Sequence, residues 1–318
     1  MSEAHTESSP SNQKGERIRA DLILLALAVI WGSAFVAQRT GMNHVGPLTF
    51  IATRFVLGCL VLLPIIRWPR LRALPRDELA GGALLGTLLF IGAACQQIGL
   101  ISTTAGKAGF ITGLYVVIVP LLSALFWRQR IGWGSWSGAA LAVAGLFLLS
   151  APDMAGTLVP SVGDLWELAG AFTWALHVIA VGRIAPKRDP LRLALVQYAV
   201  CALLSGGFAL TLESHTWAGI APAIPAILYA GIFSTGVAYT GQIVAQRHAP
   251  AAHAAIIMSM ESPFAALFGW LLLNERLSGV QLLGCGLMSV GMLLAQASTL
   301  IKPRSGRSTK RTGEPLGG

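Results

Sequence analysis

Two charged side chains lie inside apolar stretches that are otherwise suited to cross a lipid bilayer. Glu261 falls within 258–277, MSMESPFAALFGWLLLNERL, and Arg54 falls near the middle of the apolar run 47–66. A charge at the centre of a lipid-embedded helix costs about 2.5–3.5 kcal/mol on insertion scales, so it faces protein or water and usually has a function. Glu261 could bind a proton, ligate a cation or pair with Arg54, and Arg54 could anchor a substrate or form a structural ion pair. Together the two charges would suit a zwitterion, with its carboxylate on arginine and its ammonium group on glutamate.

A proline follows the buried acid at a distance of two residues. Pro263 has no N–H to bond the carbonyl group of Ser259, so the sequence predicts a kinked helix at membrane depth. The stretch 114–127, LYVVIVPLLSALFW, has the same form, with Pro120 lying 143 residues before Pro263.

Aromatic and polar side chains on several predicted helices could form the walls of a pocket around these charges. The spacing of Glu167, Trp174 and His177 places all three on one helical face, although Glu167 could be no more than an interfacial residue. Gln96 and Gln97 lie about 100° apart on a helix, so at most one of them points straight into a cavity.

Two further helical faces carry the same kinds of side chain. One face of the first predicted helix holds Trp31, Phe35 and Gln38. One face of the eighth holds Thr235, Tyr239, Gln242 and Gln246. Aromatic residues at helical spacing more often serve packing, but this mixture of groups fits a pocket for small amphipathic solutes. The candidate substrate-binding residues are Trp31, Arg54, Gln97, Trp174, His177, Tyr198, Tyr239, Gln242 and Glu261.

The bulk composition identifies an integral membrane protein. Of the 318 residues 54% are hydrophobic and only 12% are charged, about half the charged fraction of a soluble domain. The net charge of +9 would suggest nucleic-acid binding in a soluble protein, but here it reflects loop Lys and Arg residues, so no nucleic-acid partner is expected. The first apolar run lacks a small-residue cleavage site and is expected to stay as a helix.

The sequence contains no convincing motif for catalysis or for a cofactor. The four cysteines lie in apolar runs without close Cys–Cys or Cys–His spacing, so neither a disulfide framework nor a zinc site is expected. The stretch 103–109, TTAGKAG, lacks the first glycine and the Ser or Thr of a phosphate-binding loop, so it gives no reason to expect ATP as the energy source. We therefore expect no catalytic residue, no metal and no cofactor.

Long apolar windows predict an all-α protein with ten transmembrane helices. They are placed at 20–38, 47–66, 79–100, 106–127, 133–150, 163–183, 190–212, 222–246, 250–273 and 278–298. The polar tails 1–19 and 302–318 are predicted to be disordered. With this division, 19 of the 23 Lys and Arg residues fall on the side of both tails and three on the other, while Arg54 lies within a helix. The bias predicts a multi-pass protein of the cytoplasmic (inner) membrane with both termini, and the basic tail 302–318, in the cytoplasm.

The sequence repeats with a shift of 143 residues. The shift aligns Trp31 with Trp174 and Pro120 with Pro263, and after a gap of three residues a shift of 146 aligns Gly138 with Gly284 and Gly145 with Gly291. Five helices per repeat is an odd number, so the second repeat, 163–298, would be inverted relative to the first, 20–150. Inverted repeats are typical of secondary transporters, because two similar halves can expose a central site to each side in turn.

Glycines also recur in the fifth and tenth predicted helices. Gly134, Gly138, Gly284, Gly286 and Gly291 would suit close helix contacts. These two helices could form a rigid layer or the contact face of a homodimer.

The chain resembles the drug/metabolite transporter superfamily, in particular the ten-helix bacterial exporters with EamA domains. The resemblance rests on AVIWGSAFVAQ at 28–38, Arg54, TTAGKAGFITGLYVVIVPLL at 103–122 and SMESPFAALFGWLLLNERLSGVQLLGCGL at 259–287. It implies that helices one to four and six to nine line a central cavity, with five and ten outside. It also implies ATP-independent export of small metabolites such as amino acids, and it leaves proton coupling open. The alternatives are an intramembrane enzyme acting on a lipid-linked substrate and a passive channel.

Overall fold

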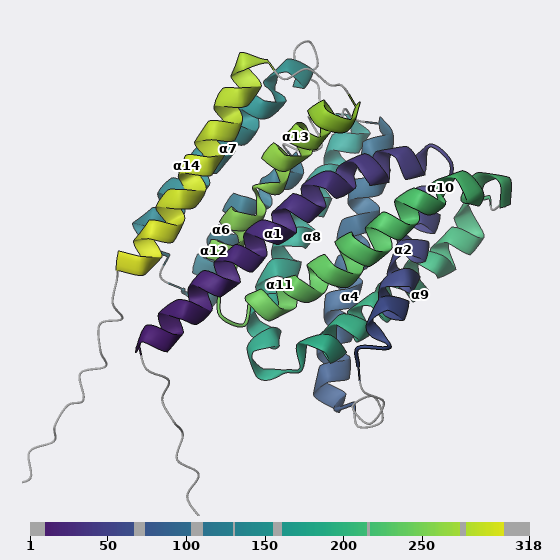
Figure 1. The fold of residues 1–318 in the computed structure, drawn as a ribbon, viewed down its shortest axis with the longest axis horizontal. Helices are drawn as coiled ribbons and strands as arrows, with labels where there is room; N and C mark the ends of the chain where they lie inside the picture. The colour runs from purple at the N-terminus through teal and green to yellow at the C-terminus, as the bar shows by residue number, and fades with distance from the viewer. Residues whose placement is uncertain are drawn as a thin grey trace, which may run out of the picture.

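A computed structural model describes residues 10–66, 74–102, 111–129, 131–154, 161–214, 217–273 and 278–301. Within these ranges the chain is built from helices that pack as one bundle (Figure 1). The start of α1 and the end of α14 lie at the same end of the bundle. The helices are α1 (Pro10–Met42), α2 (Pro47–Leu62), α4 (Arg76–Ser102), α6 (Tyr115–Trp127), α7 (Trp133–Met154), α8 (Val162–Ile184), η1 (Ala185–Lys187), α9 (Pro190–Leu212), α10 (Trp217–Tyr229), η2 (Ala230–Tyr239), α11 (Thr240–Ala245), α12 (Ala251–Met258), α13 (Glu261–Leu273) and α14 (Gly279–Ile301).

The described helices have the length and apolarity of membrane spans. Six of them are long enough to cross a bilayer, and four shorter apolar helices lie at Pro47–Leu62, Ile111–Trp127, Trp133–Leu148 and Gly279–Ala295. The large apolar side chains on the outer faces, among them Leu203 and Leu210, suit contact with lipid rather than with water. The fold is therefore that of an all-helical membrane protein.

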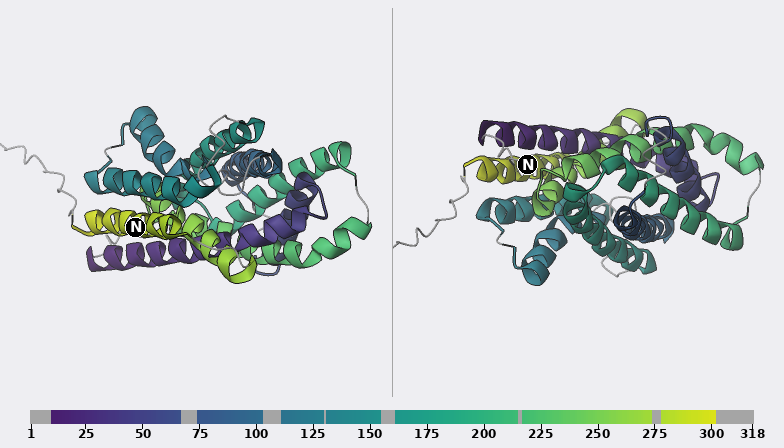
Figure 2. Two further views of the ribbon diagram at one scale, coloured as in Figure 1. Left: turned by 90° about the horizontal axis from the view of Figure 1, so that it is seen from above. Right: turned by 90° about the horizontal axis from the view of Figure 1, so that it is seen from below.

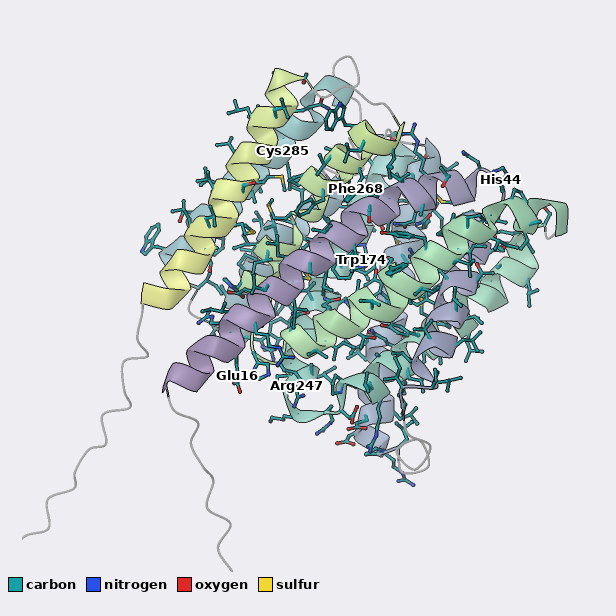
Figure 3. The ribbon with its side chains drawn as sticks, viewed as in Figure 1. Glu16, His44, Trp174, Arg247, Phe268 and Cys285 are labelled. Carbon is teal, nitrogen blue, oxygen red and sulfur yellow. The ribbon has the colours of Figure 1, made fainter. Side chains whose placement is uncertain are left out.

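The first helix begins earlier than the sequence predicts. Residues 10–19 were expected in a disordered tail, but α1 starts at Pro10, where a missing N–H costs nothing because the first helical residues have no intrahelical acceptor. Glu16, in this extension, is exposed and lies 3.4 Å from His248 at the end of the bundle (Figure 3). Residues 1–9 and the predicted tail 302–318 lie outside the described ranges, as do the motif residues 103–110 and 274–277.

The kink predicted at Pro263 is confirmed. The predicted helix 250–273 is divided into α12 and α13 by a turn at Ser259 and Met260. Because Pro263 has no N–H, the carbonyl oxygen of Ser259 instead accepts a hydrogen bond from the N–H of Ser262 at 3.2 Å. The proline thus sets the break that places Glu261 at the first turn of α13.

The predicted eighth helix contains a long π-helical segment. Residues 217–245 run through α10, the π-helix η2 and α11 without a gap. π-Helical turns are rare and often occur at functional sites. Ser234 and Tyr239 lie five residues apart, which is the hydrogen-bond spacing of a π-helix, whereas an α-helix would place them about 140° apart.

Helices α7 and α14 pack closely along one flank of the bundle (Figure 2). A Cβ atom on Gly138 would lie 2.7 Å from the carbonyl oxygen of Gly291, and one on Gly145 would lie 2.5 Å from that of Gly284. The expectation that glycines allow close approach of these helices is therefore correct for these positions. It is wrong for Gly286, where a Cβ atom would meet nothing within 4 Å because the residue faces away from α7.

We expect Gly145→Val to destabilise the protein. The new side chain would collide with backbone atoms of α14, and overpacking of this kind costs about 1–3 kcal/mol. The thermal unfolding midpoint in detergent should fall. Gly286→Val is the matched control, since it places the same side chain in open space on a helix of the same interface; an equal loss in both variants would contradict the packing argument.

Polar contacts fix the ends of the helices around the bundle. Glu213, after α9, accepts hydrogen bonds from the backbone N–H groups of Leu48 and Thr49 at 2.7 and 2.8 Å and so holds the start of α2. At the start of α9, Glu78 of α4 pairs with Arg192 at 3.0 Å. These contacts hold α2, α4 and α9 in register with one another.

Candidate functional site

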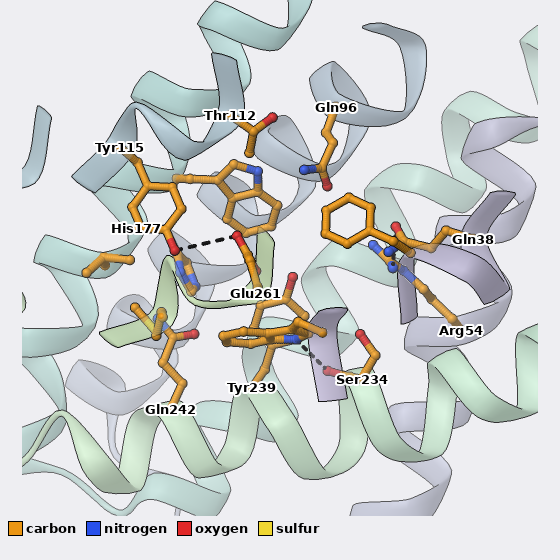
Figure 4. Close-up of a pocket in the computed structure, with 15 residues that line it drawn as sticks. Gln38, Arg54, Gln96, Thr112, Tyr115, His177, Ser234, Tyr239, Gln242 and Glu261 are labelled. Carbon is orange, nitrogen blue, oxygen red and sulfur yellow. Dashed lines mark hydrogen bonds between the residues drawn. The ribbon is translucent and has the colours of Figure 1, made fainter. Parts of the chain in front are cut away.

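A polar and aromatic cavity lies in the middle of the bundle. Its volume is about 560 Å³, the open space at its mouth included. Figure 3 shows Trp174 near the centre of the molecule, and Figure 4 shows the side chains that converge there. The lining residues are Trp31, Phe35, Gln38, Arg54, Gln96, Thr112, Tyr115, Trp174, His177, Val178, Ser234, Tyr239, Gln242, Met258 and Glu261.

Aromatic rings form one wall of the cavity. The ring of Tyr239 lies 5.0 Å from that of Trp31 and 6.2 Å from that of Trp174, with which it is nearly parallel. The indole N–H of Trp31 donates to the carbonyl oxygen of Ser234 at 3.2 Å, in the π-helical segment. The indole nitrogen of Trp174 is buried and has no hydrogen-bond partner. The wall therefore offers flat apolar surface together with a donor that a ligand could use.

Arg54 forms the cationic side of the cavity. Its guanidinium group donates to the amide oxygen of Gln38 at 3.2 Å, and Gln97 donates to the same oxygen. The guanidinium carbon lies 5.1 Å from the centre of the Phe55 ring, while the Nε atom is buried without a partner. Among the described residues Arg54 makes no ion pair, so its charge is available to an anionic group that enters the cavity.

Glu261 supplies the opposite charge. The hydroxyl group of Tyr115 donates to its carboxylate at 3.5 Å, the weak contact that Figure 4 marks with a dashed line. No ion pair joins Glu261 to a basic side chain in the part of the chain that the structure describes. Of the roles open to Glu261 and Arg54, the mutual ion pair is thus absent, although both side chains line the same cavity.

Amide side chains hold the remaining polar wall in place. His177 lies 3.2 Å from the amide oxygen of Gln197 through its Nε2 atom. Gln242 donates to Gln246 at 2.9 Å, and Gln246 donates to the carbonyl oxygen of Val178 at 2.9 Å. These bonds tie α8 to α9 and α11, so His177 and Gln242 are presented to the cavity by neighbouring helices.

The structure brings most of the candidate residues together. Trp31, Arg54, Trp174, His177, Tyr239, Gln242 and Glu261 line the cavity. Two candidates do not, because Gln97 turns to Gln38 and Tyr198 lies behind the wall with its hydroxyl group on the carbonyl oxygen of Thr235 at 2.8 Å. Gln96, the other member of the glutamine pair, lines the cavity in place of Gln97.

Sequence reasoning missed several lining residues. Thr112 and Tyr115 lie three residues apart, so their helical spacing was the available signal, but both stand in an otherwise apolar context. Met258 and Val178 carry no polar signal at all. A group of three or more His, Cys, Asp or Glu side chains that could hold a metal does not occur among the described residues.

The structure defines an all-helical membrane protein with a central cavity lined by opposite charges and aromatic rings. The chain belongs to the EamA-like transporter family, whose model matches residues 18–151 and again 161–296. The family and the names of the relatives indicate a membrane transporter rather than an enzyme.

Several relatives resemble the chain over most of their length. An uncharacterized transporter of Archaeoglobus fulgidus is 31% identical over 88% of this chain and 86% of its own. A probable amino-acid metabolite efflux pump of Escherichia coli is 27% identical over 86% of this chain and 93% of its own, and a threonine/homoserine exporter of the same species is 27% identical over 83% and 86%. A solved crystal structure superimposes with a TM-score of 0.72 at 19% identity, covering 87% of this chain and 98% of the other, which shows the fold.

Proposed function

We propose that the protein is a secondary transporter that exports small zwitterionic metabolites such as amino acids by alternating access, without ATP. The observation that carries this proposal is the presence of Arg54 and Glu261 in one cavity with no ion pair between them. Two opposite charges inside the bundle that do not neutralise each other need partners, and a zwitterion supplies both.

The geometry of the cavity supports a specific orientation of the solute. The unpaired Nε of Arg54 and its neighbouring N–H groups would receive the carboxylate, and Glu261 with Tyr115 would receive the ammonium group. The rings of Trp31, Trp174 and Tyr239 would cover the apolar part. The names of two relatives, a probable amino-acid metabolite efflux pump and a threonine/homoserine exporter, agree with this substrate class.

Alternating access would depend on two inverted repeats, 20–150 and 163–298, with ten spans. The contacts between helices support a two-fold axis that relates these repeats. Helix α1 packs on α10 and η2 as α8 packs on α4, and α1 packs on α13 as α8 packs on α6.

The glycine contacts between α7 and α14 support the same axis. Gly138 is aligned with Gly284 and Gly145 with Gly291, and the contacts join Gly138 to Gly291 and Gly145 to Gly284. Such an exchange of partners is what a self-complementary interface between equivalent helices produces. Ten spans would place both ends of the chain on one side of the inner membrane, and the bias of Lys and Arg residues towards that side supports the cytoplasm.

Growth under toxic load would test the function. Transporter-deficient bacteria that express the chain should grow in the presence of toxic amino-acid analogues, and should gain no protection against nucleobase analogues or cationic drugs. Protection against one of the latter classes alone would contradict a zwitterionic substrate. A proton gradient is the proposed energy source, and dissipation of the gradient should remove the protection.

Arg54→Gln should remove the transporter's preference for solutes that carry a carboxylate. A hydrogen-bonded charge contributes about 1.5–3 kcal/mol, so the apparent affinity for the amino acid should fall about 10- to 100-fold. Competition by the methyl ester of the same amino acid, which lacks the negative charge, should change little in this variant. Arg39→Gln, a change of the same kind on an exposed part of α1, is the control. Undiminished preference for the free acid in Arg54→Gln would contradict the assignment.

A further inference from the structure

Glu167 is a buried acid that does not line the cavity. Its side chain, on α8, is fully buried. One carboxylate oxygen accepts a hydrogen bond from the hydroxyl group of Thr112 at 2.6 Å, and the other is buried without a partner. Because Thr112 also lines the cavity, a single hydroxyl group separates this acid from the solute site.

The fold does not require an acid at this position. Glu167 and Leu24 each lie seven residues before the aligned tryptophans Trp174 and Trp31. Leu24 is also fully buried, in the corresponding helix α1. An apolar side chain therefore serves for packing at the aligned site, and a carboxyl group in its place has a cost that points to function.

The groups around Glu167 determine which ligand its carboxylate could bind. Helix α4 presses its backbone against the acid at Gly99, where a Cβ atom would lie 2.7 Å from the unpartnered oxygen. Among the described residues, the titratable groups that face it are the thiol of Cys95 on α4 and the carboxylate of Asp164 one turn earlier on α8. Among the described residues no basic side chain forms an ion pair with Glu167.

A metal cation does not suit this site. Hard cations take about six oxygen ligands, whereas the described neighbours provide one carboxylate and one hydroxyl group within hydrogen-bond distance. A proton needs only the oxygen without a partner, and it neutralises a charge for which the described residues provide no compensating cation.

Two hydroxyl groups three residues apart each bond one of the two acids. Tyr115 donates to Glu261 and Thr112, three residues earlier, donates to Glu167. We propose that Glu167 is a second proton-binding site, linked to Glu261 through Thr112 and Tyr115, and that it receives or delivers the proton on the side of the cavity where α8 begins. Its part in coupling rests on the proposed transport function, but its protonation does not.

Infrared difference spectra of the purified full-length protein, taken between acidic and alkaline buffer without substrate, test the site directly. A buried carboxyl group that gains a proton gives a carboxylic acid C=O band. We expect the parent protein to show bands from both acids, the Glu167 band to be lost in Glu167→Gln, and that same band to be retained in Glu261→Gln. Identical spectra for the parent and Glu167→Gln would overturn the proposal, whatever the outcome of the growth assay.

Thr112→Val keeps the test decisive if Glu167→Gln does not fold. Valine has nearly the same shape but cannot donate, so the C=O band of Glu167 should shift in frequency. A Ser135→Ala variant, which removes a hydroxyl group on α7 away from the cavity, should leave the band in place. An unshifted band in Thr112→Val would show that the titrating group is not the partner of Thr112.

Discussion

Replacement of Glu261 by glutamine should abolish the protection that the parent chain gives against toxic amino-acid analogues. The variant keeps the size and hydrogen-bonding capacity of the side chain but loses the charge that would receive the ammonium group. A hydrogen bond to a charged group contributes about 1.5–3 kcal/mol, which corresponds to a fall of about 10- to 100-fold in apparent affinity. Growth at equal membrane abundance of parent and variant is the measurement.

The matched control is Glu16→Gln. Glu16 stands on the exposed end of α1, with 45% of its side chain exposed, so the same substitution there should leave protection intact. If Glu261→Gln still protected the cells, Glu261 would have only a structural role. A loss in both variants would point to a general effect of the substitution rather than to the cavity.

The selectivity of the variants should be complementary. Glu261→Gln should lose its preference for the free amino acid over the N-acetylated compound, which lacks the ammonium charge, while Arg54→Gln should lose its preference over the methyl ester. Each defect follows from the loss of one charge in a cavity where the two do not pair. The double variant Arg54→Gln with Glu261→Gln, if it folds and still transports like the parent, would contradict both assignments.

The charges of the site could be predicted from the sequence because lipid makes a buried charge expensive. Glu261 and Arg54 stand out against apolar surroundings, and Pro263 marks the break beside Glu261 by its missing N–H. These signals are local to a few residues. In the structure, Glu261 and Arg54 line one cavity, and Pro263 follows the break between α12 and α13.

The rotation of each helix about its axis could not be predicted in the same way. Periodicity defines a face, but it does not say which way that face turns in the bundle, and Gln96 lines the cavity where Gln97 was expected. The π-helical segment adds a second difficulty, because its wider turn places Ser234 beside Tyr239 on the cavity wall. Thr235, expected on that face by α-helical spacing, is not among the lining residues.

Gly32→Val should destabilise the protein by forcing α1 away from α13. A Cβ atom on Gly32 would lie 2.5 Å from Cβ of Phe264 and 2.9 Å from both the backbone nitrogen of Ala265 and the carbonyl oxygen of Glu261. Two of these three atoms belong to the backbone of α13, so a side-chain rotation cannot relieve the overlap. The helices would have to separate at the turn that carries Glu261, at a cost of about 1–3 kcal/mol or more.

Thermal unfolding in detergent and the growth assay should therefore both respond to Gly32→Val. We expect a lower unfolding midpoint and loss of protection, because separation of α1 from α13 moves Trp31 and Glu261 apart in the cavity. Gly207→Val is the control, since that glycine lies in α9 with nothing within 4 Å of its Cβ position. Equal unfolding temperatures for Gly32→Val and Gly207→Val would contradict the close approach of α1 and α13. The position of Glu261 would then need another explanation.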